Sequence, residues 1–308
     1  MLNVINITIP FFSLIFFGTF LNHIGFFKNK EERLLAKTAF FVFMPAMIYY
    51  KIASTPAINF LNIDFILLYE VSTVVIFLLA YPIGKLFKLE LDAIGIFGLC
   101  SAYPNYGYIG IPMALIAFGD GAAAPIALII FANTLTLILM TSLYVSFHRG
   151  QSSSGATVKL LLKTVISNPI ILAVTGGMLS AILGLKLPSV VNSSLFLMAG
   201  AAAPVALVAL GASLSFGLLH TAMVQIFSIS LMKLLIHPFL VFIVFYLWST
   251  EERVWVQTAL LCASLPVAAN VYMLASHFNA HVTESANAIV VSTLLSTISI
   301  PAILFFLL

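Results

Sequence analysis

The stretch Leu99-Cys-Ser-Ala-Tyr-Pro104-Asn-Tyr-Gly-Tyr-Ile-Gly-Ile-Pro112 lies inside a long apolar run. The stretch Leu261-Cys-Ala-Ser-Leu-Pro266-Val-Ala-Ala-Asn-Val-Tyr272 repeats its Leu-Cys pair and its proline 162 residues later. Each surrounding apolar run is about 28 residues long, which exceeds the roughly 20 residues that cross a bilayer as a helix. A central proline removes a backbone donor and clashes with the preceding turn. Both runs are therefore predicted to be broken helices.

The composition places these breaks in a membrane. Of 308 residues, 62% are hydrophobic and only 7% are charged, whereas about 25% is usual for soluble domains. A net charge of +3 is too small for a nucleic-acid-binding face. The two cysteines, Cys100 and Cys262, cannot form a disulfide framework or a multi-cysteine metal site, and neither a Walker A nor an HExxH motif is present. We therefore expect a protein of the lipid bilayer that is not an enzyme, holds no cofactor or metal and binds no nucleic acid.

Hydropathy divides the chain into ten stretches that can span the hydrocarbon core. The first five run over about 3–22, 31–52, 63–86, 91–118 and 121–147, and the second five over about 159–183, 188–217, 222–248, 251–278 and 282–307. Basic residues in loops and at span ends gather on one side, namely Lys28, Lys30, Arg33, Lys37, Lys85, Lys88, Arg149, Lys159 and Lys163, against Lys51, Lys186 and Arg253 on the other. The positive-inside rule then puts both termini outside the cytoplasm. The expected location is the plasma membrane, as a bacterial inner-membrane protein.

The chain also divides at its midpoint into two similar halves. At an offset of 159 residues, Pro10, Gly18, Gly25 and Pro45 match Pro169, Gly177, Gly184 and Pro204. We predict a first five-helix repeat over 1–147, a cytoplasmic linker over 148–158 that contains the Ser/Gly-rich segment 151–155, and a second repeat over 159–308. Because each half has an odd number of helices, the second must be inverted, an architecture typical of secondary transporters. The predicted fold is an all-α membrane protein built as a 5+5 inverted repeat.

Residues that can bind an anion follow both central prolines. The half-helices that begin after Pro104 and Pro266 would present free N–H groups and the positive end of the helix dipole to the middle of the membrane. The candidate substrate-binding side chains around these ends are Asn105, Tyr106, Tyr108, Asn270 and Tyr272. The alternative for each asparagine is that it caps its own half-helix and never meets the substrate.

Ionisable residues within a span also need an explanation, because each costs about 2.5 to 3.5 kcal/mol at a helix centre. Lys233 lies near the middle of the eighth span, and His237 follows one turn later on the same face. Lys233 can bind an anionic substrate or act with His237 in a proton-coupled switch. It can also pair with Glu70 of the third span, and that pair could itself couple transport to an ion, H⁺ or Na⁺. Four further prolines are expected to make simple kinks: Pro45, Pro82, Pro204 and Pro238.

Four segments taken together resemble the auxin efflux carrier family, which includes bacterial malonate and malate permeases and the plant auxin exporters. They are 104–112, the pair Asn168-Pro169, the run 203–214 and the run 265–272. The resemblance covers the whole chain and implies a bile-acid-symporter-like (NhaA-like) fold with crossing helices 4 and 9. It implies a scaffold of helices 1, 2, 6 and 7 and a moving transport unit of helices 3–5 and 8–10. It maps the crossover prolines onto Pro104 and Pro266, and the substrate-facing asparagines onto Asn105 and Asn270.

The sequence therefore predicts a secondary transporter that moves a small organic anion, a mono- or dicarboxylate, by alternating access. The short central loop favours a bacterial-type carrier over an auxin exporter. Two alternatives stay open: a sodium- or proton-coupled symporter for a bile-acid-like or neutral solute, and a non-transporting membrane sensor. The small-residue run 199–203 can pack against a second copy in a homodimer or inside the monomer.

Overall fold

The computed structural model describes residues 2–28, 30–148, 154–214, 222–249 and 251–308, and within them the chain is helical and contains no strand. The first half holds α1 (Leu2–His23), α2 (Glu31–Thr38), η1 (Ala39–Phe43), α3 (Met44–Ala53), η2 (Ala57–Leu61), α4 (Ile63–Leu86), α5 (Leu91–Ala102), η3 (Tyr106–Gly110), α6 (Ile111–Phe118), η4 (Gly119–Ala122) and α7 (Ala123–His148). The second holds α8 (Ser154–Ser167), α9 (Pro169–Ile182), α10 (Ser189–Ser213), α11 (Met223–Leu231), η5 (Met232–Ile236), α12 (His237–Trp248), α13 (Arg253–Ala263), α14 (Asn270–Phe278) and α15 (Val282–Leu307). Residues 149–153 of the predicted linker and 215–217 of the predicted seventh span lie outside the described residues.

Seven helical runs of the described residues are long and apolar enough to cross a membrane, so the chain is a multi-pass membrane protein. The other three predicted spans, 91–118, 159–183 and 251–278, consist of shorter helices with non-helical residues between them. The break between α8 and α9 was not predicted, and a single helix over 159–183 is wrong. Its cause is the Asn168-Pro169 pair: Pro169 has no N–H to bond back into α8, and a residue before proline avoids the helical region. Asn168 is accordingly extended, with φ −90° and ψ 109°.

Two of the four predicted proline kinks take a different form. Pro45 and Pro238 each lie two residues after a π-helical turn, η1 and η5, instead of kinking a regular α-helix. The same arrangement precedes Pro112, which follows η3. Proline has no N–H to donate to the carbonyl four residues before it. In the wider π-helical turn the extra residue shifts the hydrogen-bond pattern, so this missing bond is not required there. Pro82 and Pro204 lie inside uninterrupted α4 and α10.

Close backbone contact joins α1 to α10. A Cβ added to Gly211 would lie 1.8 Å from the carbonyl oxygen of Ile15, and one added to Gly18 would lie 2.1 Å from that of Val208. The Thr19 hydroxyl also donates to the Gly211 carbonyl over 3.0 Å. Small residues that let helices approach, together with an interhelical hydrogen bond, are how helices associate without a hydrophobic driving force.

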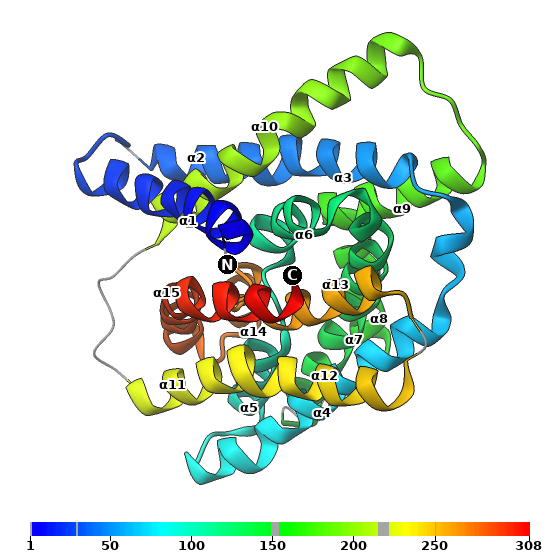
Figure 1. The fold of residues 1–308 in the computed structure, drawn as a ribbon. Coiled ribbons are helices and arrows are strands. Elements are labelled where there is room, and N and C mark those ends of the chain that lie inside the picture. The colour runs from blue at the N-terminus through cyan, green and yellow to red at the C-terminus, as the bar shows by residue number, and fades with distance from the viewer. Residues whose placement is uncertain (1, 29, 149–153, 215–221, 250) are drawn as a thin grey trace.

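The helices pack in two groups. α10 packs on α1, α2 and α3, and α3 packs on α9, whereas α4 packs on α5, α7 and α12, and α11 on α15. In Figure 1, α1, α2, α3 and α10 lie along one side, and α4, α5, α11 and α12 lie on the opposite side. The small-residue run 199–203 of α10 contributes Ala202 to the interior, where it is fully buried. The assignment of these groups to a scaffold and a transport unit is taken up below.

One of the matched glycine pairs ends two helices in the same way. Gly25 after α1 and Gly184 after α9 are both left-handed, with φ of 71° and 61°. In both places the glycine N–H bonds to the carbonyl three residues back, and the next residue bonds to the carbonyl five residues back. This is the glycine-containing motif that caps helix carbonyls. The inverted arrangement of the two halves remains a prediction.

Candidate functional site

The two non-helical segments between α5 and η3 and between α13 and α14 cross and pair with one another. The Asn105 N–H donates to the Pro266 carbonyl over 2.9 Å, and the Ala268 N–H donates to the Tyr103 carbonyl over 3.0 Å. Pro104 and Val267 form an antiparallel bridge between them. Because non-helical backbone at membrane depth must be satisfied within the protein, each segment supplies partners that the other needs.

Two further contacts tighten the crossing. The Val267 N–H donates to the Ser292 hydroxyl of α15 over 3.0 Å. A Cβ added to Gly110 would lie 2.6 Å from a side-chain methyl of Leu265, so a larger residue there would require the Leu265 side chain to move.

Asn105 uses its two side-chain ends differently. It is the N-cap of η3, where its Oδ1 accepts the Tyr108 N–H over 3.2 Å. Its Nδ2 is buried and has no hydrogen-bond partner among the described residues, and the whole residue is 2% exposed. The two predicted roles of Asn105, capping and ligand binding, thus fall on different atoms and do not exclude each other.

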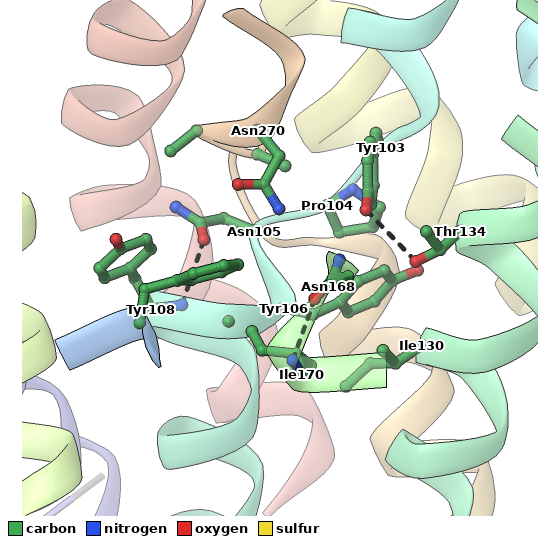
Figure 2. Close-up of a pocket in the computed structure, with 14 residues that line it drawn as sticks. Tyr103, Pro104, Asn105, Tyr106, Tyr108, Ile130, Thr134, Asn168, Ile170 and Asn270 are labelled. Carbon is green, nitrogen blue, oxygen red and sulfur yellow. Dashed lines mark hydrogen bonds between the residues drawn. The ribbon is translucent and has the colours of Figure 1, made fainter. Parts of the chain in front are cut away.

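A small pocket with an empty volume of about 370 Å³, open space at its mouth included, lies against the crossing. It is narrow, so a ligand of several heavy atoms requires side chains at the mouth to move. The described residues that line it include no charged side chain; they are Phe40, Tyr103, Pro104, Asn105, Tyr106, Gly107, Tyr108, Ile130, Thr134, Asn168, Ile170, Ala268, Ala269 and Asn270. Figure 2 shows that they come from several helices around the crossing.

Asn270 reaches the pocket from the second half-helix. It is the first residue of α14, and Ala269 occupies the N-cap position without a side-chain cap. Its side chain interacts with the Tyr103 hydroxyl, which also shares a hydrogen bond of 3.2 Å with the Thr134 hydroxyl. Thr134 was missed from the sequence, because nothing in a local pattern shows that α7 runs beside the crossing. Tyr103 was missed because only the residues that follow Pro104 were considered.

Asn168 also lines the pocket, and sequence reasoning used it only as a family motif. It is the N-cap of α9, and its Oδ1 accepts the N–H groups of Ile170 over 3.0 Å and of Ile171 over 3.4 Å. Its signal was present: an asparagine followed by proline is the preferred start of a helix. Interpreted as a helix start, the Asn168-Pro169 pair would have predicted a third helix that begins within a span, in addition to the two that follow Pro104 and Pro266.

A buried hydrogen-bond network leads away from the pocket through Tyr106. The Tyr106 hydroxyl donates to Asn133 Oδ1 over 2.9 Å and shares a bond of 3.2 Å with the Tyr69 hydroxyl. Asn133 Nδ2 in turn donates to Thr73 over 2.8 Å and to Glu70 Oε1 over 3.3 Å. Glu70, predicted as a coupling residue, is therefore outside the pocket but joined to a residue that lines it.

Lys233 lies elsewhere. Its Nζ donates to the carbonyl of Ala263 over 2.5 Å and lies 3.4 Å from Nδ1 of His237, and the side chain is fully buried. Of the alternatives left open for Lys233, the pair with Glu70 is not formed: the ion pairs between described residues do not include it. The physical reason is that the last carbonyls of α13 lack helical donors, and the N–H groups of Lys233 supply a donor to one of them.

The structure thus brings together Pro104, Asn105, Tyr106, Tyr108 and Asn270 of the predicted site residues. Pro266 contributes its carbonyl to the crossing but does not line the pocket. Four other predicted site residues do not line the pocket either: Lys233, Glu70, His237 and Tyr272. Tyr272 is 47% exposed on the outer face of α14, because it lies two residues after Asn270 and helical residues two apart face in different directions.

Comparison with known proteins adds to this geometry. A family model described as membrane transport protein matches residues 3–304. A Rhizobium meliloti (strain 1021) protein named "Putative malonate transporter" is 29% identical over 307 residues, which are 99% of this chain and 96% of that protein. An uncharacterized transporter of Methanothermobacter thermautotrophicus is 25% identical over 292 residues, which are 94% of this chain and 93% of that protein. The resemblance drawn from the four motifs is confirmed, and the chain belongs to the membrane transport protein family, that of the auxin efflux carriers.

Proposed function

We propose that the chain is a secondary carrier that binds a small organic anion at the helix crossing. The observation that carries the proposal is the Nδ2 group of Asn105, a buried donor without a partner among the described residues. Leaving such a group unpaired costs about 1 to 3 kcal/mol. A ligand that accepts a hydrogen bond there would recover this cost.

An anion suits this place better than a neutral solute. Helices begin at Asn105 and at Asn270, and the N-terminal end of a helix carries a partial positive charge of about half an elementary charge. With no acidic side chain among the described residues that line the pocket, a carboxylate meets attraction without opposing charge. A bile-acid-like solute would require a wider apolar cavity. The name of the Rhizobium meliloti relative, a malonate transporter, supports a carboxylate.

Alternating access would move one group of helices against the other. We assign α1, α2, α3, α8, α9 and α10 to the scaffold, and α4 to α7 and α11 to α15 to the transport unit. With η1 counted with α2 and α3, the pocket would lie between the two groups, because Asn168 and Phe40 of η1 come from the first and the crossing comes from the second. Lys51 of α3 and Asp120 of η4 form an ion pair of 2.6 Å across the same boundary.

Coupling to an ion would act through Glu70. Its carboxylate is joined to Tyr106 through Asn133, so a change in its charge state would reach a side chain of the pocket. His237 lies within reach of Lys233, which holds the end of α13. Location in a bacterial inner membrane with both termini outside, and a homodimer, belong to the same proposal.

Reconstitution tests the proposal. Purified protein in liposomes is given radiolabelled malonate, malate, acetate and indole-3-acetate, and protein-free liposomes give the background. We expect saturable uptake of at least one acid. Binding of an acid without any flux would support the sensor instead, and flux of bile acids alone would support the symporter for such solutes. Absence of both binding and flux for every acid would contradict an anion carrier.

A further inference from the structure

Asn168 repeats the arrangement of Asn105 on the opposite group of helices. Each asparagine is an N-cap whose Oδ1 accepts backbone N–H groups of the helix that follows. In each, the oxygen is occupied by the cap and the Nδ2 is left as the donor. Unlike Asn105, Asn168 is only half-buried. None of the hydrogen bonds found among the described residues uses its Nδ2, which in Figure 2 lies on the side of the amide away from the bond to Ile170.

The two asparagines belong to different parts of the fold. Asn105 begins a half-helix of the crossing, whereas Asn168 begins α9, which packs on α3. Both line the same pocket. The buried and unpartnered Nδ2 of Asn105 is an independent observation that points to an acceptor at this pocket, and the start of α9 adds a second donor end to the same pocket.

Each donor end can serve one carboxylate. At each end, the helix dipole and the side-chain amide can interact with a carboxylate. The described lining residues include no lysine or arginine that would bind the carboxylate instead. A monocarboxylate satisfies one end and leaves the other unpaired. Sites that hydrogen-bond a ligand discriminate strongly against an analogue that lacks the partner group, because their own polar groups then stay unpaired.

Resting on the proposed function, we propose that the substrate is a dicarboxylate that bridges the two groups of helices, with one carboxylate at Asn105 and the other at Asn168. Asn168 is then the residue that distinguishes dicarboxylates from monocarboxylates. A ligand bound in this way contacts both moving parts at once.

The test combines a change in the ligand with a change in the protein. Malonate and monomethyl malonate, in which one carboxylate is esterified, compete with labelled malonate for uptake by proteoliposomes. Asn168→Ser keeps a capping oxygen but removes the amide donor. Asn62→Ser is the control: Asn62 caps α4 through Phe65 N and lies outside the pocket, and its amide donates to Glu251, so this variant also loses an amide donor without touching the pocket.

In the unmodified chain and in Asn62→Ser, we expect esterification to weaken competition at least about tenfold, or 1.4 kcal/mol. In Asn168→Ser the two ligands should compete almost equally, because the second subsite is already lost. Asn168→Asp also keeps the cap, and its added negative charge should exclude malonate more than the ester. Asn168→Asp replaces Asn168→Ser in the test if the serine variant does not fold.

An equal penalty for esterification in the unmodified chain and in Asn168→Ser would overturn the inference, and so would the absence of any penalty in the unmodified chain. Uptake of monocarboxylates only would also overturn it and leave the proposed function standing. Absence of uptake of every acid would instead count against the proposed function.

Discussion

The Tyr106 hydroxyl donates to the side-chain oxygen of Asn133 over 2.9 Å, and this bond joins the pocket to a carboxylate within the membrane. Asn133 is fully buried and uses its amide to hold Glu70 and Thr73 at the same time. A proton gained or lost at Glu70 would change the hydrogen bonds available to Asn133, and Asn133 in turn orients Tyr106. The network gives a physical route from an ionisable group to a side chain that lines the pocket.

Glu70→Gln should separate exchange from accumulation. The glutamine keeps the size and an acceptor for Asn133 but cannot exchange a proton. We expect counterflow of labelled substrate to persist and uptake driven by a proton gradient to fall to background. Glu284→Gln, at the start of α15, is the control and should keep both. Gradient-driven uptake by Glu70→Gln at the unmodified rate would remove Glu70 from the coupling mechanism.

Lys233→Met should lower stability rather than affinity. Its Nζ donates to the Ala263 carbonyl at the end of α13, and leaving a buried acceptor without its donor costs about 1 to 3 kcal/mol. We expect a lower melting temperature in detergent and a reduced maximal rate, with a KM close to that of the unmodified chain. A KM raised about tenfold, or 1.4 kcal/mol, at unchanged stability would restore Lys233 as a substrate ligand.

Cross-linking should stop transport if the two groups of helices move. Lys51 and Asp120 lie on opposite sides of the proposed boundary, and an exposed ion pair is worth only about 0 to 1 kcal/mol, so Lys51→Cys with Asp120→Cys should fold. We expect a short bismaleimide to block uptake in this double variant and not in either single variant. The native thiols of Cys100 and Cys262 are fully buried. Full uptake after complete cross-linking would contradict relative movement there.

Gly211→Ala should loosen the contact of α1 with α10. The added methyl would meet the Ile15 carbonyl at 1.8 Å, and relieving such a clash costs about 1 to 3 kcal/mol. We expect a lower melting temperature and a lower yield of monodisperse protein. Gly200→Ala, on the same helix with no heavy atom within 4 Å, is the control and should be neutral or slightly stabilising. Equal melting temperatures for the two variants would show that this contact does not limit stability.

The sequence predicts the broken helices and the polar residues beside them well, because proline and glycine act locally. The positions of Pro104 and Pro266 locate the two segments that cross, and Asn105 follows directly from the first. The break at Asn168 could also have been predicted, since its signal, an asparagine followed by a proline, is equally local. It was passed over because the surrounding run 159–183, although it contains Lys159 and Lys163, is mostly apolar and long enough for one span.

Contacts between distant helices could not be predicted in this way. Hydropathy shows that Lys233 and Glu70 lie within spans, but it does not show the rotation of either helix or its neighbours. The sequence therefore left several partners open for Lys233: a substrate anion, His237 and Glu70. The Ala263 carbonyl, a backbone group at a helix end, was not among them. Asn133 and Thr134 of α7 were missed for the same reason.

The central claim is that Asn105 binds an organic anion, and uptake by Asn105→Asp tests it most directly. Aspartate keeps the oxygen that caps the half-helix but replaces the free amide donor with negative charge. With equal amounts of folded protein in liposomes, the account predicts saturable uptake of labelled malonate by the unmodified chain and by Asn22→Asp, an exposed control at the end of α1. It predicts a loss of at least about tenfold, or 1.4 kcal/mol, in Asn105→Asp. Uptake by folded Asn105→Asp at the unmodified rate and KM would contradict the account.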